Sequence, residues 1–142
     1  PYVTGLTQVG IRNVSSTAKE GYDAARAMGS DILSVRQMRK LGPPGIIERI
    51  PAGAKVYVTL DIDGFCPSIA PGTGTPSHGG FLYYEVLEML QALARRNEVV
   101  GIDLVEVAPD YDPTGSTAIL AAQILLNFLG FVFDARAGRS AR

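Results

Sequence analysis

Apolar and polar residues change their spacing several times along the chain, from short β-type runs to longer helical ones. Runs typical of strands cover residues 6–12, 31–35, 56–60 and 99–105. Helical spacing covers residues 17–28, 37–41, 45–50, 82–96 and 116–134. Because strands and helices alternate, the pattern predicts a three-layer α/β/α fold with a mainly parallel sheet. We expect one domain over residues 1–142.

Local signals sharpen some of these elements. Residues 56–60, VYVTL, are nearly all apolar or β-branched, which predicts a strand buried on both faces. Ser15, Ser16 and Thr17 are candidate N-caps, and Glu20 follows Thr17 at capping-box spacing. The tail over residues 135–142 is small and basic, and we expect it to be frayed.

The last helical run is unusual because residues 117–133 carry no charge and approach the length of a membrane span. Gln123 and Asn127 lie one turn apart within it, and it directly follows a strand and a loop. These features favour a helix packed inside the fold, or at a subunit contact, over a membrane-spanning segment.

Composition narrows the classes of function. The chain has 142 residues, of which 46% are hydrophobic and 19% charged, so it can bury a core. Its 13 basic and 14 acidic side chains give a formal net charge of -1, which argues against nucleic-acid and anionic-membrane partners. Cys66 is the only cysteine, which excludes an internal disulfide. We expect no signal peptide, a cytoplasmic location, and a chain cut from something longer.

Carboxylates lie at the ends of two strands that are consecutive in the sequence. Asp61 and Asp63 end the third strand, and Glu106 ends the fourth. Ligands of α/β sheets lie at these carboxyl ends, and residues two apart on a strand point to the same side. Two adjacent carboxylates raise each other's pKa unless a cation lies between them. Oxygen ligands without a thiolate favour a hard ion such as magnesium or manganese.

Other interpretations of the Asp-x-Asp pair stay open at this point. Aspartates at strand ends often accept hydrogen bonds from neighbouring loop amides, and the pair alone is weak evidence for a metal. Phe65 in the fifth place disfavours a phosphatase of the Asp-x-Asp-x-Thr type. A glycosyltransferase that uses manganese and a nucleotide sugar is compatible with the spacing.

Four further residues have structural interpretations. We expect Asp103, inside the fourth strand, to orient a loop or a neighbour of a ligand. Asp110 and Asp112 flank Tyr111 in a polar loop, where Asx-turn hydrogen bonds account for them. Arg12 follows the first strand and is a candidate partner for an acidic group near the site.

A longer motif resembles a known family. Residues 59–80, TLDIDGFCPSIAPGTGTPSHGG, resemble the signature of the ureohydrolases, the arginase and agmatinase family. Residues 100–109, VGIDLVEVAP, are similar to the family's next strand and acidic loop, and residues 8–12, QVGIR, to its Gly-Ile-Arg strand. The resemblance covers nearly the whole chain, leans towards agmatinases, and implies the C-terminal half of an arginase-like fold.

The resemblance also implies a reaction and a set of site residues. Members of the family are manganese enzymes that hydrolyse a guanidino compound to urea and an amine. By this resemblance Asp61 bridges two manganese ions, Asp63 binds one of them, and Glu106 receives the guanidinium. Thr75 lies in the loop that lines the pocket. His78 either contacts the substrate or is an exposed loop histidine.

The chain departs from the family pattern in three ways. Cys66 stands where the family usually has an Asp, and Ser77 and His78 stand where many agmatinases have an acidic residue. His78 is also the only histidine, so the histidine ligands of the family's first half are missing. We therefore predict the C-terminal portion of an agmatinase-like manganese amidinohydrolase, which acts on a small guanidino substrate as a homo-oligomer. The alternative is an inert fragment that self-associates and binds at most one divalent metal weakly.

Overall fold

The computed structural model describes residues 2–12 and 17–140, with four helices and four strands in that part of the chain. The strands are β1 (Leu6–Ile11), β2 (Ser30–Ser34), β3 (Lys55–Asp61) and β4 (Glu98–Val105). The helices are α1 (Lys19–Ala27), α2 (Val35–Ile47), α3 (Tyr83–Arg96) and α4 (Ser116–Ser140). One-turn 3-10 helices follow β3 and β4, namely η1 (Ile62–Gly64) and η2 (Pro109–Tyr111).

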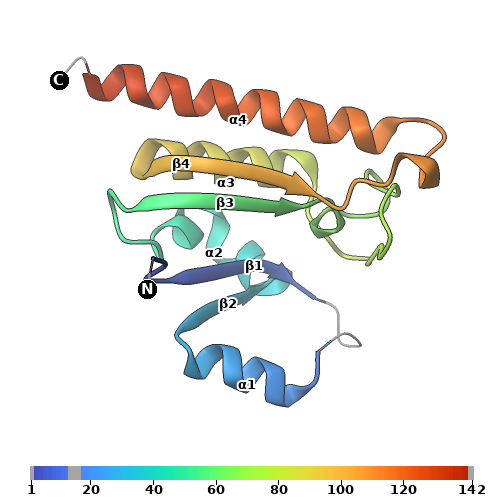
Figure 1. Ribbon diagram of the computed structural model, residues 1–142, viewed down its shortest axis with the longest axis horizontal. Coiled ribbons are helices and arrows are strands. Elements are labelled where there is room, and N and C mark those ends of the chain that lie inside the picture. Colours follow the sequence, from blue (N-terminus) through green and yellow to red (C-terminus); the bar gives the residue numbers. More distant parts are fainter. Residues whose placement is uncertain (1, 13–16, 141–142) are drawn as a thin grey trace.

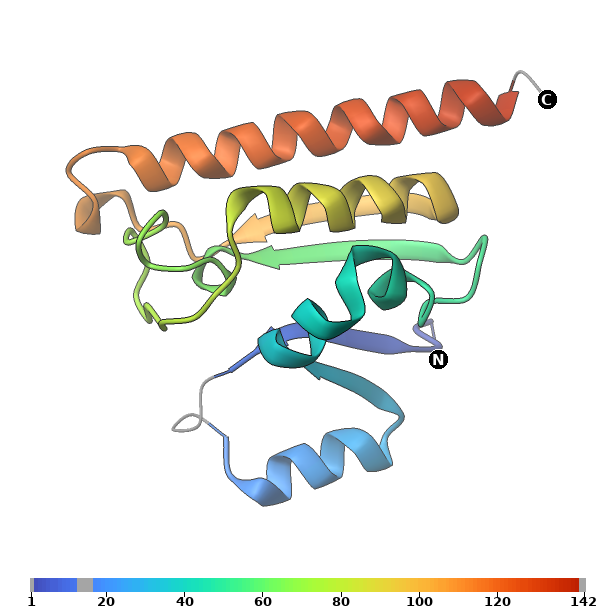
Figure 2. The same ribbon diagram turned by 180° about the vertical axis from the view of Figure 1, so that it is seen from behind.

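The strands pair in parallel, as the alternation of elements predicts. β1 pairs with β2 and β3 pairs with β4, which gives two two-stranded sheets in the described part of the chain. α2 and α3 lie behind the strands in Figure 1 and in front of them in Figure 2. α4 runs along α3, while α2 contacts β1, β2 and α3 and so connects the two strand pairs.

The core lies where α3 and α4 pack together and against the β3–β4 pair. Its most buried large side chains include Ile62, Phe65, Ile124 and Phe128, each at most 2% exposed. Met38 extends this core into α2. α1 contributes no buried residue and packs on the edge of the molecule beside β2.

The β3–β4 pair has one packed face and one open face. Val56, Val58 and Leu60 pack against the core, whereas the alternate residues Tyr57 and Thr59 are exposed. The other members of the open face are Asp61, Gly101, Asp103 and Val105, by their register with these residues. The prediction that this strand is buried on both faces is therefore wrong in the described structure. Its alternating burial follows from packing on one side only.

A bulge keeps the two strands in phase. Val56 pairs with Val99, but Tyr57 pairs with Gly101, so Val100 is the extra residue. Without it, the side chains after Val99 would fall on the wrong face. The ring of Tyr57 lies over Gly101, where an added Cβ would come within 2.7 Å of the ring.

Two predictions about helix starts are corrected. α1 begins after Ala18, with no side-chain cap, so the predicted box between Thr17 and Glu20 is wrong; Ser15 and Ser16 lie outside the described residues. A capping box does occur at α2, where Ser34 and Gln37 bond each other reciprocally. Because Ser34 is the N-cap of α2, β2 ends at Ser34, one residue before the predicted end at Val35. The predicted break inside α2 is confirmed at Gly42, whose φ is +70°.

The prediction of a frayed tail is wrong as far as Ser140, because α4 continues to that residue. Arg136 Nη2 donates to the carbonyl of Val99 at 2.9 Å, and Arg139 Nη1 donates to that of Ala94 at 3.2 Å. These contacts attach the last turns to α3 and β4. By length and composition α4 would be able to cross a membrane, but its buried face packs against α3.

Candidate active site

The two aspartates after β3 are held by the turn that follows the strand. Asp61 is the last residue of β3, and its Oδ1 accepts a hydrogen bond from Asp63 N at 3.0 Å, across the start of η1. Ile62, between them, is completely buried. The 3-10 turn, and not the alternation of an extended strand, therefore places Asp63 beside Asp61.

Glu106 follows β4 and approaches these aspartates from the neighbouring strand. Its φ of +66° makes it the one non-glycine residue with positive φ in the described part of the chain. Such a conformation is costly for a residue with a Cβ, and strain of this kind is common at functional sites.

The three carboxylates influence one another. Partial burial raises the pKa of Asp61 above its ordinary value, and the negative charges of Asp63 and Glu106 raise it further. The N–H of Asp63 and the cation of Arg12 act in the opposite direction without cancelling the rise. The structure thus gathers the carboxylates at the ends of two parallel strands, where the sequence places them.

The loop after η1 brings one further predicted site residue into the cluster. Thr75 Oγ1 donates to Asp63 Oδ2 at 3.0 Å. His78 is exposed, and its carbonyl accepts from Arg12 Nε at 3.3 Å. Cys66 Sγ accepts from Ser68 Oγ at 3.2 Å, and this hydrogen bond lowers the pKa of the thiol.

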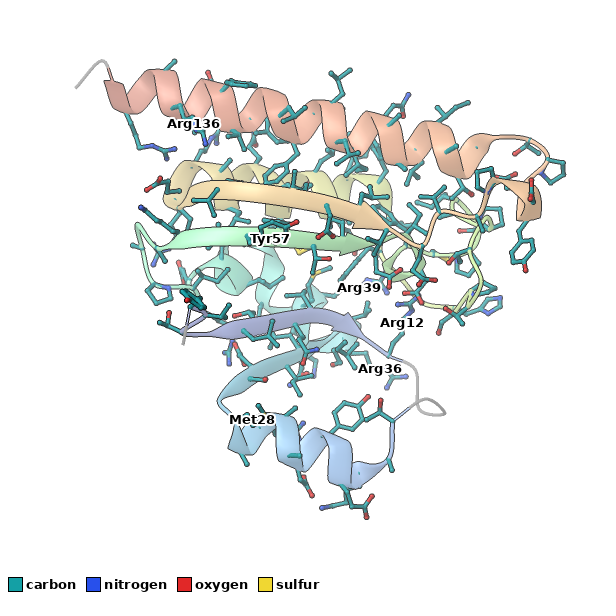
Figure 3. The ribbon with its side chains drawn as sticks, in the orientation of Figure 1. Arg12, Met28, Arg36, Arg39, Tyr57 and Arg136 are labelled. Carbon is teal, nitrogen blue, oxygen red and sulfur yellow. The ribbon has the colours of Figure 1, made fainter. Side chains whose placement is uncertain are left out.

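Arg12 bonds main-chain oxygens where an acidic partner is expected from the sequence. Its Nη2 donates to the carbonyls of Asp63 and Ser77, the latter at 2.7 Å. Figure 3 shows Arg12 at the end of β1, reaching towards this loop. The guanidinium therefore fastens the first strand pair to the loop that carries Asp63.

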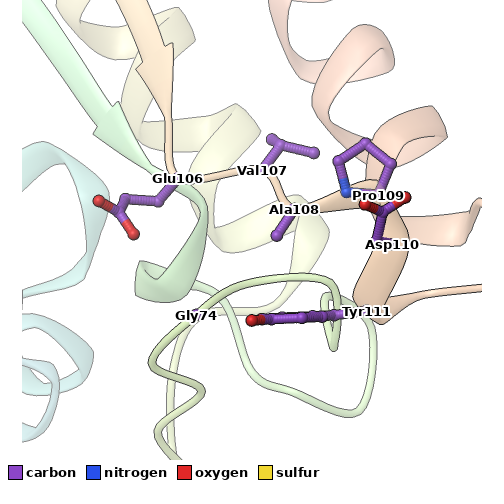
Figure 4. Close-up of a pocket in the computed structure, with 7 residues that line it drawn as sticks. All are labelled: Gly74, Glu106, Val107, Ala108, Pro109, Asp110 and Tyr111. Atoms are coloured by element: carbon purple, nitrogen blue, oxygen red, sulfur yellow. The ribbon is translucent and has the colours of Figure 1, made fainter.

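An open cavity of about 430 Å³ lies beside the cluster (Figure 4). Its lining comes from two loops: Gly74 on one, and Glu106, Val107, Ala108, Pro109, Asp110 and Tyr111 on the other. Of the predicted site residues only Glu106 is part of this lining. Its carboxylate points away from Tyr111 and Asp110, which lie on the other side of the cavity lining in Figure 4.

The two cavity loops are joined by a buried hydrogen-bond hub around Asp112, which is 4% exposed. Asp112 accepts from the backbone N–H and the hydroxyl of Thr114, and from both groups of Thr117 at 2.7 Å. These donors lower the pKa of Asp112 to about 2. Thr117 Oγ1 in turn accepts from Gly72 N at 2.9 Å, which fastens the loop of Gly74 to the start of α4.

Sequence reasoning found only part of this hub. The Asx turn expected at Asp112 is present as its bond from Thr114 N, but the link to Gly72 joins residues 45 apart and was missed. The spacing Asp-x-Thr-x-x-Thr was the available local signal. Only glycine fits at position 72, since an added Cβ would lie 2.9 Å from Asp112 Cβ.

Asp103 lies on the open face of the β3–β4 pair and orients two side chains of β3. It accepts from Tyr57 OH at 2.9 Å and from the hydroxyl of Thr59. The bond to Asp103 raises the pKa of Tyr57. Asp103 thus organises the open face beside the cluster, with an orienting role like the one expected for it.

The cluster offers part of a metal site. The described residues contain no group of three or more His, Cys, Asp or Glu side chains arranged to hold a metal ion. Asp61 and Asp63 supply carboxylate oxygens, and partial burial together with the negative charges of Asp63 and Glu106 raises the pKa of Asp61. Two such carboxylates fit a hard divalent cation as a partial ligand set.

Fold and site together define a class: a parallel α/β protein with acidic side chains gathered where two adjacent strands end. Comparison with known proteins specifies it further, because the chain belongs to the arginase family, whose model matches residues 2–130. The predicted ureohydrolase relationship and arginase-like α/β/α fold are therefore confirmed.

The names of individual relatives describe activities on guanidino compounds. Human mitochondrial guanidino acid hydrolase is 39% identical over 127 residues, which cover 87% of this chain and 36% of that protein. Mitochondrial agmatinase from Gallus gallus is also 39% identical, with 87% and 37% covered. The structure of proclavaminate amidino hydrolase from Streptomyces clavuligerus superposes with a TM-score of 0.82 at 37% identity, covering 91% of this chain and 43% of that one. The chain thus spans about two fifths of the length of these relatives.

Proposed function

We propose that this chain carries the C-terminal share of the active site of a manganese-dependent amidinohydrolase, which converts a small guanidino compound to urea and an amine. The observation that carries the proposal is the gathering of Asp61, Asp63 and Glu106 where β3 and β4 end, with the pKa of Asp61 raised by partial burial and by its acidic neighbours. Family membership and the named activities of the relatives support the same reaction class.

Each carboxylate has a separate role in this proposal. Asp61 and Asp63 hold manganese, together with ligands that come from outside the described cluster. Manganese held there would supply a water molecule of lowered pKa as the nucleophile for the guanidinium carbon at neutral pH. Glu106 accepts the N–H groups of the planar guanidinium and orients its carbon towards the metal side.

The loop residues have supporting roles. The hydroxyl of Thr75 holds the side chain of Asp63 in place through its 3.0 Å bond. Contact of Thr75 and His78 with substrate stays a prediction. The same is true of the cytoplasmic location and of the choice among guanidino substrates.

Manganese binding by the purified chain tests the proposal, with stoichiometry from elemental analysis and affinity from calorimetry. We expect one weakly bound ion, and we expect Asp61→Asn to abolish its binding while the circular dichroism spectrum is unchanged. Asp110→Asn is the matched control, because it removes an exposed carboxylate from the cavity loop outside the aspartate pair.

Three outcomes separate the alternatives. Undiminished binding by Asp61→Asn would show that the ligand assignment is wrong. No binding by the unaltered chain would show that it carries no share of the metal site, whereas one weak ion is compatible with both the proposal and the inert fragment. Two tightly bound ions would show a complete site, and a urea-release assay with guanidino compounds would then follow.

A further inference from the structure

A second open cavity, of about 230 Å³, lies beside the first pair of strands. Its lining comes from β1 and β2, from α1 and from the start of α2. Ile11 and Ile32 form the apolar part, and the polar part consists of Arg12, Tyr22, Arg26, Ser34 and Gln37. Ile11 and Ser34 are the last residues of β1 and β2, so the cavity lies at the carboxyl ends of these strands, where α/β sheets bind ligands.

The charge of this cavity is opposite to that of the cavity beside the carboxylate cluster. Among the described residues, two arginines and no carboxylate line it, whereas Glu106 and Asp110 and no basic side chain line the other. Arg36 adds a further cation: it adjoins Gln37 in the chain, is exposed, and forms no ion pair with a described residue. Figure 3 shows Arg12 and Arg36 at the same end of the strand pair. A concave surface of this charge attracts anions.

The guanidinium of Arg26 is oriented by an aromatic ring and is only weakly paired with an acid. Its Cζ lies 5.9 Å from the centre of the Tyr22 ring, within the range of a cation–π contact. Its acidic partner is Asp23, whose Oδ1 is 4.0 Å from Arg26 Nη1, the outer limit of an ion pair. Lys19 Nζ donates to Oδ2 of the same carboxylate at closer range. Arg26 therefore keeps N–H donors that it can offer to another anion.

The capping box of α2 leaves the amide nitrogen of Gln37 available. Gln37 Oε1 accepts from Ser34 N at 2.9 Å and from Ser34 Oγ at 2.8 Å, so the oxygen of the amide is committed to the cap. Its Nε2 donates to no described residue. A side-chain amide nitrogen carries two N–H donors and no acceptor. The residue that starts α2 thus offers only donors to the cavity that it lines.

Arg12 supplies charge to the cavity, because its own donors are already used. Its Nε donates to the carbonyls of Ser77 and His78, and its Nη2 to those of Asp63 and Ser77. Its Nη1 donates to the carbonyl of Gly10 at 3.4 Å. Carbonyl oxygens are neutral groups, so these bonds fix the guanidinium without neutralising it. Its positive charge remains in the wall of the cavity.

We propose that this cavity binds a small oxyanion, either free phosphate or the carboxylate of a small organic acid, through Arg26 and Gln37. Arg12 and Arg36 supply additional positive charge. Guanidinium and amide N–H groups match the acceptor geometry of phosphate and carboxylate oxygens. The volume is below the roughly 300 Å³ of pockets for drug-sized ligands, so the occupant is small. The two isoleucines of the lining accommodate a short carbon chain beside the charged group.

Calorimetric titration of the metal-free chain with inorganic phosphate, and separately with succinate, tests the proposal. A chelator first removes metal and is then dialysed away, because it is itself a competing anion. We expect saturable binding of at least one probe at millimolar concentrations. Tighter binding of phosphate would identify a phosphate site, and tighter binding of succinate a carboxylate site. Since no metal is present, the result does not depend on the proposed manganese chemistry.

Gln37→Glu is the most informative variant. Glutamate completes a capping box as well as glutamine does, so the circular dichroism spectrum and the thermal stability should be retained. Its carboxylate replaces the amide donor, and binding should weaken at least about tenfold. Arg26→Gln removes an exposed cation from the lining and should weaken binding by a similar factor.

Arg95→Gln is the matched control. It also removes one exposed arginine charge, but from the last turn of α3, which precedes the amino end of β4 at the opposite edge of the strands. It should leave the affinity unchanged, as should Asp61→Asn. Nuclear magnetic resonance locates the anion: phosphate should shift the Nε–H signal of Arg26 and the side-chain amide signals of Gln37.

Four results would overturn the proposal. The first is no binding of either probe at millimolar concentrations. The second is equal weakening by Arg26→Gln and Arg95→Gln, which would attribute binding to net charge. The third is undiminished binding by a folded Gln37→Glu variant. The fourth is a set of phosphate-induced shifts that leaves the signals of Arg26 and Gln37 unchanged, which would place the anion elsewhere on the surface.

Discussion

Asp61, at the end of β3, and Asp112, just after η2, are two aspartates near the same cavity, and their surroundings are opposite. Asp112 is 4% exposed and receives four hydrogen bonds from Thr114 and Thr117, which lower its pKa to about 2. Asp61 occupies an exposed position and receives one bond from Asp63 N, and partial burial of its carboxyl group together with two acidic neighbours raises its pKa.

The difference separates a structural carboxylate from one that is available to a ligand. The negative charge of Asp112 is fully compensated by protein donors, so it stabilises the loops and has no free lone pairs to offer. The charges of Asp61, Asp63 and Glu106 repel one another, and a cation would remove that repulsion. Perturbed acids with incomplete compensation are candidates for function.

The largest expected effect is the loss, in acid, of the stability that ionised Asp112 contributes to the folded chain. The pKa of Asp112 in the folded chain, about 2, lies below the unfolded value of about 3.9, so its contribution is complete above the unfolded pKa. It is lost as the pH falls from about 4 to about 2. Asp112→Asn should therefore be less stable than the unaltered chain at pH 6, and the gap should narrow towards pH 2.

Urea denaturation at a series of pH values measures that gap. Asp31 and Glu85, whose pKa values are also lowered by arginine partners, titrate in both proteins and cancel in the difference. A gap that stays constant with pH would mean that the ionised form of Asp112 is not what stabilises the hub.

Removing one hydroxyl from the hub should have a smaller effect. Thr117→Val keeps the shape of a fully buried side chain but leaves Gly72 N–H without its acceptor and Asp112 without one donor. We expect a loss of about 1–3 kcal/mol in the free energy of unfolding. Thr117→Ser retains the hydroxyl and should lose less; an equal loss would mean that the hydrogen bonds of the hydroxyl contribute no more to stability than the packing of the methyl group.

The sequence predicts the carboxylate cluster because its members directly follow two strands. The carboxyl ends of parallel strands lie at the same edge of the sheet, so Asp61, Asp63 and Glu106 can be assigned to that edge without coordinates. The hub cannot be found in this way, because the bond between Gly72 and Thr117 joins a loop to a helix that begins 44 residues later. Nothing in local spacing fixes that approach.

Burial was harder to predict than secondary structure. Tyr57 and Thr59 are good β-formers, and their high β propensity made a strand with one open face look like one buried on both. The tail was misjudged for a related reason. Its composition favours fraying, but contacts from Arg136 and Arg139 to carbonyls of β4 and α3 extend the helix. Tertiary contacts decide both cases.

Glu106 allows the strain at the cluster to be measured. Glu106→Gly and Glu106→Ala both remove the carboxylate, but only glycine adopts a φ of +66° without strain. We expect the glycine variant to be more stable than the alanine variant by about 1 kcal/mol in thermal or urea denaturation. Equal stability would show that the backbone relaxes in solution, and the conformation of Glu106 would then carry no functional information.

The smallest effect, and one of opposite sign to that at the hub, is expected for Asp61→Asn in the metal-free chain. Asparagine retains an oxygen to accept from Asp63 N while removing a negative charge that Asp63 and Glu106 repel. Because the site is exposed and screened by solvent, the stabilisation should not exceed about 0.5 kcal/mol. Urea denaturation with a chelator present measures it, with Asp110→Asn as the control for removing one surface charge. A loss as large as that for Thr117→Val would instead make Asp61 a structural cap of η1, equivalent in kind to Asp112. A neutral or stabilising change combined with lost manganese binding would show that this carboxylate is retained for its ligand.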